Sequence, residues 1–67
     1  MNLCINGNAK VFNIAELTVA SLVNALDLSG KRLAIERNGE IVPRSQFSVV
    51  FLQEGDKLEI VGAVGGG

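Results

Sequence analysis

The residues with the most distinctive potential chemistry are Gly65, Gly66 and Gly67, into which the apolar segment EIVGAV runs at the end of the sequence. Glycine loses more backbone freedom on ordering than any other residue, so a glycine run is a poor continuation of a strand. Without side chains, such a run can enter a narrow channel and present a carboxyl group. That carboxylate has a pKa of about 3.3–3.7 and needs a leaving group, such as an adenylate, before a nucleophile attacks it. The segment is therefore either a loose end or the working part of the chain.

The rest of the sequence offers few groups for catalysis. It contains no histidine, which is the usual general base near neutral pH. The acids of QEGDK, Glu54 and Asp56, are too few for a calcium loop, and we interpret that segment as a turn. We expect no autonomous enzyme, no bound cofactor and no metal site. The seven acidic residues are scattered along the chain: Glu16, Asp27, Glu36, Glu40, Glu54, Asp56 and Glu59.

Composition also limits the cell compartment and the class of partner. Cys4 is the single cysteine. It has no cysteine or histidine partner, so we interpret it as an apolar filler, and we expect a reducing compartment, the cytoplasm. The net charge of −1 and the pI of about 5.1 argue against nucleic-acid binding. The apolar runs are too short to span a bilayer, so we expect no membrane partner. We expect instead that the chain binds other proteins and that it is a monomer when free.

Alternation of apolar and polar residues predicts a hairpin at the start of the chain. MNLCIN has the period of a half-buried strand, and AKVFNI returns after the turn at Asn6-Gly7-Asn8. The positions expected to face the core are Met1, Leu3 and Ile5 in the first strand and Phe12 and Ile14 in the second, where Val11 is the competing choice.

A helix is predicted next, in LTVASLVNALDLSGK. Its apolar face repeats at i, i+3, i+4 and i+7, and Thr18 is a suitable N-cap. Leu17 and Leu22 occupy the positions of a hydrophobic staple. We expect Ser29-Gly30 to end the helix, with two basic residues near its negative end. The apolar face consists of Val19, Leu22, Val23 and Leu26.

The second half of the sequence predicts several short strands. RLAIERNGEIV has Leu33 and Ile35 facing inward and a tight turn at Asn38-Gly39, and Pro43 leaves the sheet or lies at its edge. SVVFLQEGDKLEIVGAV has two apolar runs around the turn EGD, with Leu58 and Ile60 on one face of the second run.

These elements predict an α+β fold in two layers, with one helix across one face of a mixed sheet of four to five strands. The first and last strands are the most apolar, so we place them side by side in the middle of the sheet. This is the outline of a β-grasp, the ubiquitin-like fold. We expect a β-grasp domain over residues 1–64 and a flexible glycine tail over residues 65–67.

Two segments, ERNGEIVPRSQF and LQEGDKLEIVGAVGGG, resemble the sulfur-carrier proteins of thiamine-thiazole biosynthesis, the ThiS family. The resemblance covers residues 1–67, and NGEIVPR and the final glycine pair are its most specific parts. Phe47 departs from the family pattern, in which many members have tryptophan. Because the change is conservative, it puts little of the resemblance in doubt.

The resemblance implies a carrier rather than a catalyst. An E1-like, ThiF-type adenylyltransferase is expected to use ATP to activate the Gly67 carboxylate. Sulfur from a cysteine desulfurase persulfide then gives a thiocarboxylate, and a ThiG-type thiazole synthase receives the sulfur. Gly65 and Gly66 would thread the active site of the partner.

The residues that dock partners are less well defined by the sequence. We assign Val64 to an interface and leave Val61 and Leu52 open between the core and an interface. Arg44 either binds a carboxylate or phosphate of a partner or is a solvated charge. Three alternative functions remain: a molybdopterin-synthase small subunit, a modifier that forms isopeptide bonds, and a passive β-grasp binding module.

Overall fold

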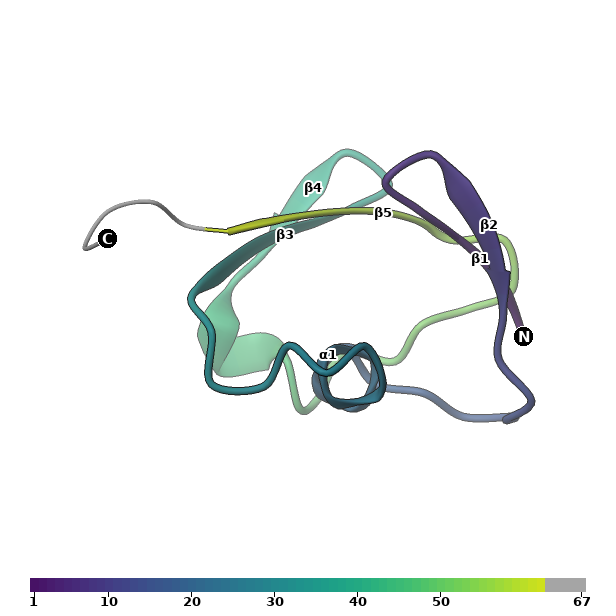
Figure 1. Cartoon of the computed structure of the whole chain (residues 1–67), viewed down its shortest axis with the longest axis horizontal. Coiled ribbons are helices and arrows are strands. Elements are labelled where there is room, and N and C mark those ends of the chain that lie inside the picture. Colours follow the sequence, from purple (N-terminus) through teal and green to yellow (C-terminus); the bar gives the residue numbers. More distant parts are fainter. Residues whose placement is uncertain (63–67) are drawn as a thin grey trace.

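A computed structural model of the chain describes residues 1–62, and residues 63–67 lie outside the described part. A five-stranded sheet forms one layer, and a single α-helix crosses one of its faces (Figure 1). The elements are β1 (Asn2–Ile5), β2 (Asn8–Val11), α1 (Val19–Ala25), β3 (Leu33–Arg37), β4 (Glu40–Val42), the 3-10 helix η1 (Arg44–Gln46) and β5 (Lys57–Gly62).

The strand order is β2-β1-β5-β3-β4. Strands β1 and β5 are parallel, and the other neighbours pair antiparallel. The first and last strands are therefore neighbours in the middle of a mixed sheet, as the sequence predicts. The predicted α+β, β-grasp fold is confirmed.

The core lies between the sheet and α1. Leu3 and Ile5 on β1 and Leu58 and Ile60 on β5 are buried, and the residues between them are half-buried or exposed, so the predicted phase of the first and last strands is correct. Leu22 and Ile35 are completely buried and meet in this layer from the helix and the sheet. The buried apolar residues are Leu3, Ile5, Leu17, Val19, Leu22, Val23, Ile35, Val42, Leu52, Leu58 and Ile60.

Thr18 caps α1 as predicted, because its Oγ1 accepts a hydrogen bond from the Ser21 amide at 3.0 Å. The helix ends at Ala25, however, about one turn before the predicted stop at Ser29-Gly30. Asp27 has a φ of 61°, which is left-handed and cannot continue a right-handed helix. The last turn consequently contains no basic residue.

Two features of the connecting segments differ from the sequence interpretation. Strand β2 ends at Val11, and Ile14 is 48% exposed rather than in the core. The Phe12 amide makes a final bond to the Met1 carbonyl (2.7 Å), after which the chain leaves the sheet. The run SVVFL is not a sheet strand: Phe51 forms an isolated bridge with Thr18.

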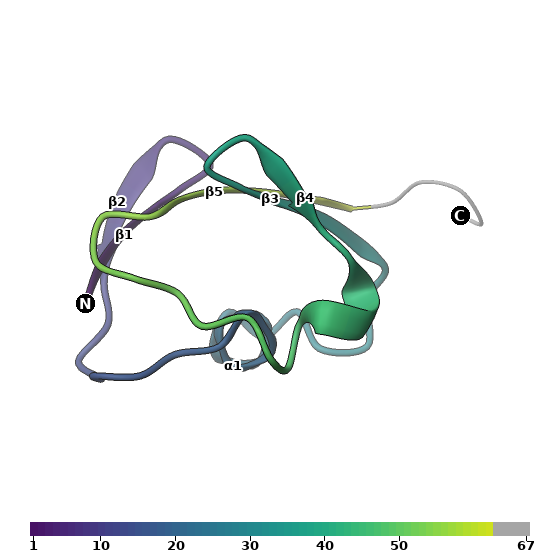
Figure 2. The same cartoon turned by 180° about the vertical axis from the view of Figure 1, so that it is seen from behind.

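The segment that contains this run braces the start of α1. The Val19 amide bonds the Val50 carbonyl at 3.0 Å, and the Leu52 amide bonds the Leu17 carbonyl at 2.8 Å. Figure 2 shows this connection and η1 on the same side of the sheet as α1. Within residues 1–62, no helix has the length and hydropathy of a membrane span.

Candidate functional site

The candidate site begins at the end of β5. This strand lies in the middle of the sheet and ends at Gly62, the last described residue (Figure 1). The predicted sulfur-carrying residue Gly67, the threading residues Gly65 and Gly66, and the docking residue Val64 lie outside the described residues. The structure thus defines the strand that precedes these residues in the chain.

The docking residues that the structure does describe fall into different environments. Val61 is 57% exposed on β5. Arg44 is exposed at the start of η1. Leu52 is only 4% exposed and belongs to the core, because its backbone pairs with Leu17 and carries the side chain under the sheet. The assignment of Leu52 to a docking surface is therefore corrected: it is a packing residue.

Asn6 holds β5 from the β1 side. Its amide donates to the Leu58 carbonyl at 2.9 Å, as in a parallel ladder. Its side chain then donates from Nδ2 to the Ile60 carbonyl (3.0 Å) and accepts from the Ile60 amide at Oδ1 (2.7 Å). The side-chain amide thus adds one more step of pairing after β1 has ended at Ile5.

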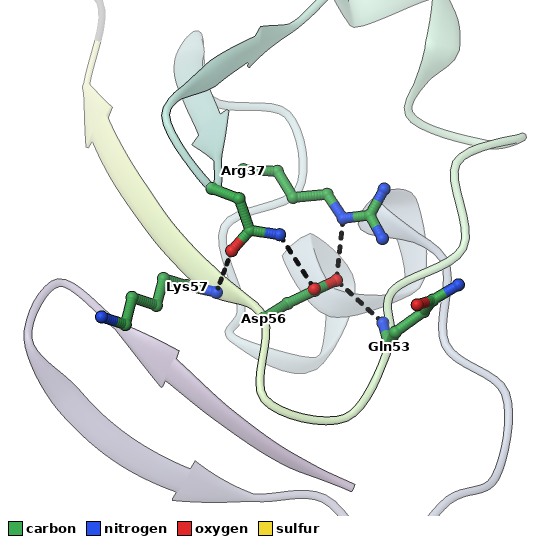
Figure 3. Close-up of polar contacts among 5 residues, drawn as sticks. Arg37, Gln53, Asp56 and Lys57 are labelled. Atoms are coloured by element: carbon green, nitrogen blue, oxygen red, sulfur yellow. Dashed lines mark hydrogen bonds and ion pairs between the residues drawn. The ribbon is translucent and has the colours of Figure 1, made fainter.

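Asp56, the residue directly before β5, connects the start of that strand to the end of β3. It is the one buried charged residue in the described part of the chain, 6% exposed. Figure 3 shows its carboxylate between Arg37 and the backbone of Gln53, with Lys57 next along the strand. Its three donors are Arg37 Nε at 2.7 Å, the Gln53 amide at 2.8 Å and Asn38 Nδ2 at 3.0 Å.

Asn38 links this carboxylate to the backbone of β5. Its side-chain Oδ1 accepts a hydrogen bond from the backbone amide of Lys57 at 2.9 Å, and the backbone amide of Asn38 donates to the Lys57 carbonyl at 2.8 Å. Burial acts to raise the pKa of Asp56, but the hydrogen bonds from Asn38, Gln53 and Arg37 outweigh it. The pKa of Asp56 therefore lies below its ordinary value of 3.8, and the carboxylate is an anion in the folded protein.

The other acid of QEGDK also has a structural role. The Glu54 carboxylate accepts the Asn2 amide with both oxygens, at 3.0 and 3.1 Å, and this bond holds the pKa of Glu54 below its usual range. Gly55 has a φ of +86°, as a turn requires, and its amide donates to the Asn2 carbonyl at 2.8 Å. The segment is a turn, as predicted, and its acids hold the backbone.

Sequence reasoning identified the Asn-Gly turns but missed what their side chains do. Asn6 and Asn38 both have a φ of 51° and both bond β5. Asparagine before glycine was the available signal, because asparagine tolerates positive φ and its amide can replace a backbone pair. The pairing of Arg37 with Asp56 had no signal in local sequence, since the two residues are brought together only by the sheet.

The remaining candidates are the thiol of Cys4 and a metal site. Cys4 is half-buried on β1, with Ala9 and Lys57 as its neighbours in register. Residues 1–62 contain no group of three or more side chains that could hold a metal ion.

The family model that matches this chain is described as the ThiS family, and it covers residues 5–67. The chain belongs to the ThiS family. It is 38% identical over 65 residues to the Sulfur carrier protein ThiS of Bacillus subtilis, covering 97% of this chain and 98% of that protein. The crystal structure of the thiamine biosynthesis protein ThiS from Geobacter metallireducens matches with a TM-score of 0.87, 33% identity and full coverage of both chains.

A third relative of this ThiS-family chain is much longer. The thiazole synthase of Paramagnetospirillum magneticum is 46% identical over 67 residues, which cover all of this chain but only 20% of that protein. The ThiS-family chain therefore spans about a fifth of the length of this relative. The protein named thiazole synthase thus contains a segment that is similar to this whole chain.

Proposed function

We propose that this chain is a sulfur carrier in thiamine biosynthesis and that the α-carboxyl group of Gly67 carries the sulfur. The observation that carries the proposal is family membership over residues 5–67, which includes the glycine run. The relative named as a sulfur carrier has nearly the same length as this chain. The proposal requires that Gly67 has a free carboxyl group in the working protein.

The proposed reaction belongs to partner enzymes. An E1-like, ThiF-type adenylyltransferase transfers AMP from ATP to the Gly67 carboxylate and releases pyrophosphate. A persulfide that received its sulfur from a cysteine desulfurase attacks the carbonyl carbon, and AMP leaves. A second thiol then cleaves the sulfur–sulfur bond, which leaves the thiocarboxylate on Gly67 and a disulfide on the partner. ATP is bound by the partner, and the carrier holds no cofactor.

We propose a ThiG-type thiazole synthase as the acceptor of the sulfur. The support is the long relative named thiazole synthase, in which a similar segment is part of the same chain. A second thiazole synthase, from Magnetococcus marinus, is 38% identical over 70 residues. If a carrier and its acceptor share one polypeptide, the acceptor is expected to use the sulfur that the carrier delivers. We propose that this chain acts in the cytoplasm, together with its partner enzymes.

The role of the fold in this proposal is to hold β5 still while the segment after it reaches into a partner. Asn6 and Asn38 bond the strand from opposite sides, at Ile60 and at Lys57. From Gly62, five residues reach at most about 16–18 Å when extended. The folded body can therefore stay at the mouth of an active site while Gly67 is inside it.

Intact-mass spectrometry tests the proposal. Protein expressed from its own gene must first have the mass of a chain that ends at Gly67. After incubation with the adenylyltransferase, ATP and a sulfur source, the expected mass change is the exchange of one oxygen for one sulfur. A chain without Gly66 and Gly67 must fold and remain unmodified. Active partners that leave the full chain unchanged would disprove the proposal, as would a truncated chain that still supports thiamine synthesis.

A further inference from the structure

The face of the sheet opposite α1 carries charged and apolar side chains close together. On β3 and β5, the exposed residues alternate with the buried Ile35, Leu58 and Ile60 and so point away from the core. Ile41 on β4 lies next to them, because it pairs with Glu36. We call this surface the acidic–apolar patch and define it as Ala34, Glu36, Ile41, Glu59 and Val61.

The centre of the patch is a pair of like charges. Glu36 and Glu59 are direct partners in the antiparallel pairing of β3 and β5. Side chains in such positions have Cβ atoms about 4.5–5.5 Å apart, and like charges there are destabilising. Within residues 1–62, neither carboxylate has a hydrogen-bond or ion-pair partner, and the one ion pair found there joins Arg37 to Asp56.

Among the described residues, no basic side chain forms an ion pair with Glu36 or Glu59. Lys57 precedes Glu59 by two residues on the same face of β5, and it makes no ion pair in the described part of the chain. Arg32 precedes β3 and already has an interaction partner. The described part of the fold therefore keeps two like charges side by side on its surface, with no ion pair to either of them.

Two exposed apolar side chains border the acidic pair. Ile41, 65% exposed, pairs with Glu36, and Val61, 57% exposed, follows Glu59 on the same face of β5. Two adjacent carboxylates bordered by apolar side chains fit one basic side chain that has apolar neighbours of its own. Arginine suits this arrangement best, because its planar guanidinium donates to two carboxylates at once and is weakly hydrated.

We propose that the acidic–apolar patch docks the enzyme that activates the Gly67 carboxylate, through an arginine or lysine placed between Glu36 and Glu59. This inference rests on the proposed function. It follows from reach: an enzyme that acts on Gly67 comes within about 16–18 Å of Gly62, and Val61 of the patch is the residue before it. The enzyme therefore covers the end of β5 and contacts the face beside it.

A second copy of this chain does not fit the patch. Two patches that face each other would bring their acidic pairs together and add two further like charges to the two already present. The docking partner must therefore present positive charge, which supports a different protein rather than self-association.

Steady-state kinetics of adenylation test the proposal with Glu36→Gln, Glu59→Gln and the double variant. The control is Glu16→Gln, which changes the net charge as much as each single variant does, at an exposed position before α1. We expect the double variant to raise KM for the carrier roughly 5- to 30-fold at low salt, because a close charge pair is lost. The turnover number kcat should stay unchanged, and KM should depend less on salt concentration than in the wild type.

Thermal unfolding supplies a readout that separates docking from folding. Removing one charge of the acidic pair should raise Tm by about 1–5 °C, because the repulsion is relieved in the folded state. The conservative variant Glu59→Asp should retain both the repulsion and a KM near that of the wild type. A higher Tm together with a higher KM identifies residues kept for binding rather than for stability.

Two results would overturn the inference. The first is that the wild type is adenylated and the double variant has the same KM and the same salt dependence of KM as Glu16→Gln. The other is sedimentation evidence for a dimer of this chain that Val61→Thr disrupts. If the wild type is never adenylated by an active partner, the proposed function itself fails.

Discussion

The side-chain amide of Asn6 forms two hydrogen bonds with the backbone of Ile60, one to its carbonyl and one from its amide. Strand β1 ends at Ile5, so the side chain takes the place of the next strand residue beside β5. The amide can do this because Asn6 adopts a φ of 51° at the start of the turn. One asparagine therefore both shapes the hairpin and fixes the strand that leads to Gly67.

The first prediction concerns this contact. Asn6→Asp keeps an oxygen that accepts the Ile60 amide but places a second oxygen against the Ile60 carbonyl. We expect a loss of about 1–3 kcal/mol in the free energy of unfolding, measured by urea denaturation. Asn6→Gly keeps the positive φ and loses both bonds without the repulsion, so it should cost no more than Asn6→Asp. An aspartate variant as stable as the wild type would show that the donated bond is unimportant.

The second prediction concerns the pH dependence of stability. Because the folded-state pKa of Asp56 is lowered, its carboxylate stabilises the fold above the unfolded-state pKa, near 3.8, and this contribution is lost as the pH falls through and below that value. We expect Asp56→Asn to be about 1–3 kcal/mol less stable than the wild type above about pH 5. The difference should shrink toward pH 2, where the wild-type carboxyl becomes protonated.

Denaturation of both proteins at several pH values checks this prediction. The Glu54 carboxyl also has a lowered pKa, so the comparison is repeated with Glu54→Gln in both proteins. A difference between the Asp56 forms that is unchanged from pH 7 to pH 2 would show that the ionised carboxylate contributes nothing specific.

The sequence predicts the architecture well because the patterns of its central elements agree with one another. Leu3, Ile5, Leu58 and Ile60 alternate with polar residues, and these strands occupy the middle of the sheet. Thr18 caps α1 through a hydrogen bond to a residue only three positions away, so the start of α1 is predicted correctly. These features depend on neighbours within a few residues.

The errors arise where distant contacts decide the outcome. Phe51 and Leu52 are adjacent apolar residues, and only the contact with the start of α1 determines that Phe51 is exposed and Leu52 buried. Ile14 follows a regular alternation that ends when β2 leaves its partner. The acidic pair of Glu36 and Glu59 likewise depends on the register of two strands far apart in sequence.

The third prediction separates packing from docking at two residues that the sequence grouped together. Leu52→Ala should lower the free energy of unfolding by about 2–5 kcal/mol, because it opens a cavity beneath the sheet. Val61→Ala changes an exposed strand position and should cost less than about 1 kcal/mol. Thermal or urea denaturation of the two variants provides the measurement. Similar losses in both would mean that Val61 also packs in the core.

The last prediction tests the arm with a matched pair of glycine substitutions. Gly66→Ala adds a methyl group on the residue directly before Gly67, where a narrow partner channel would reject it. We expect a loss of at least tenfold in kcat/KM for adenylation with Tm unchanged within about 2 °C, since the substitution lies after the last strand of the sheet in the sequence. Gly62→Ala is the control, because a Cβ there meets nothing within 4 Å and the φ of Gly62 is not positive. The control should fold and lose much less kcat/KM than Gly66→Ala, whereas equal losses in both variants would mean that the channel hypothesis is wrong.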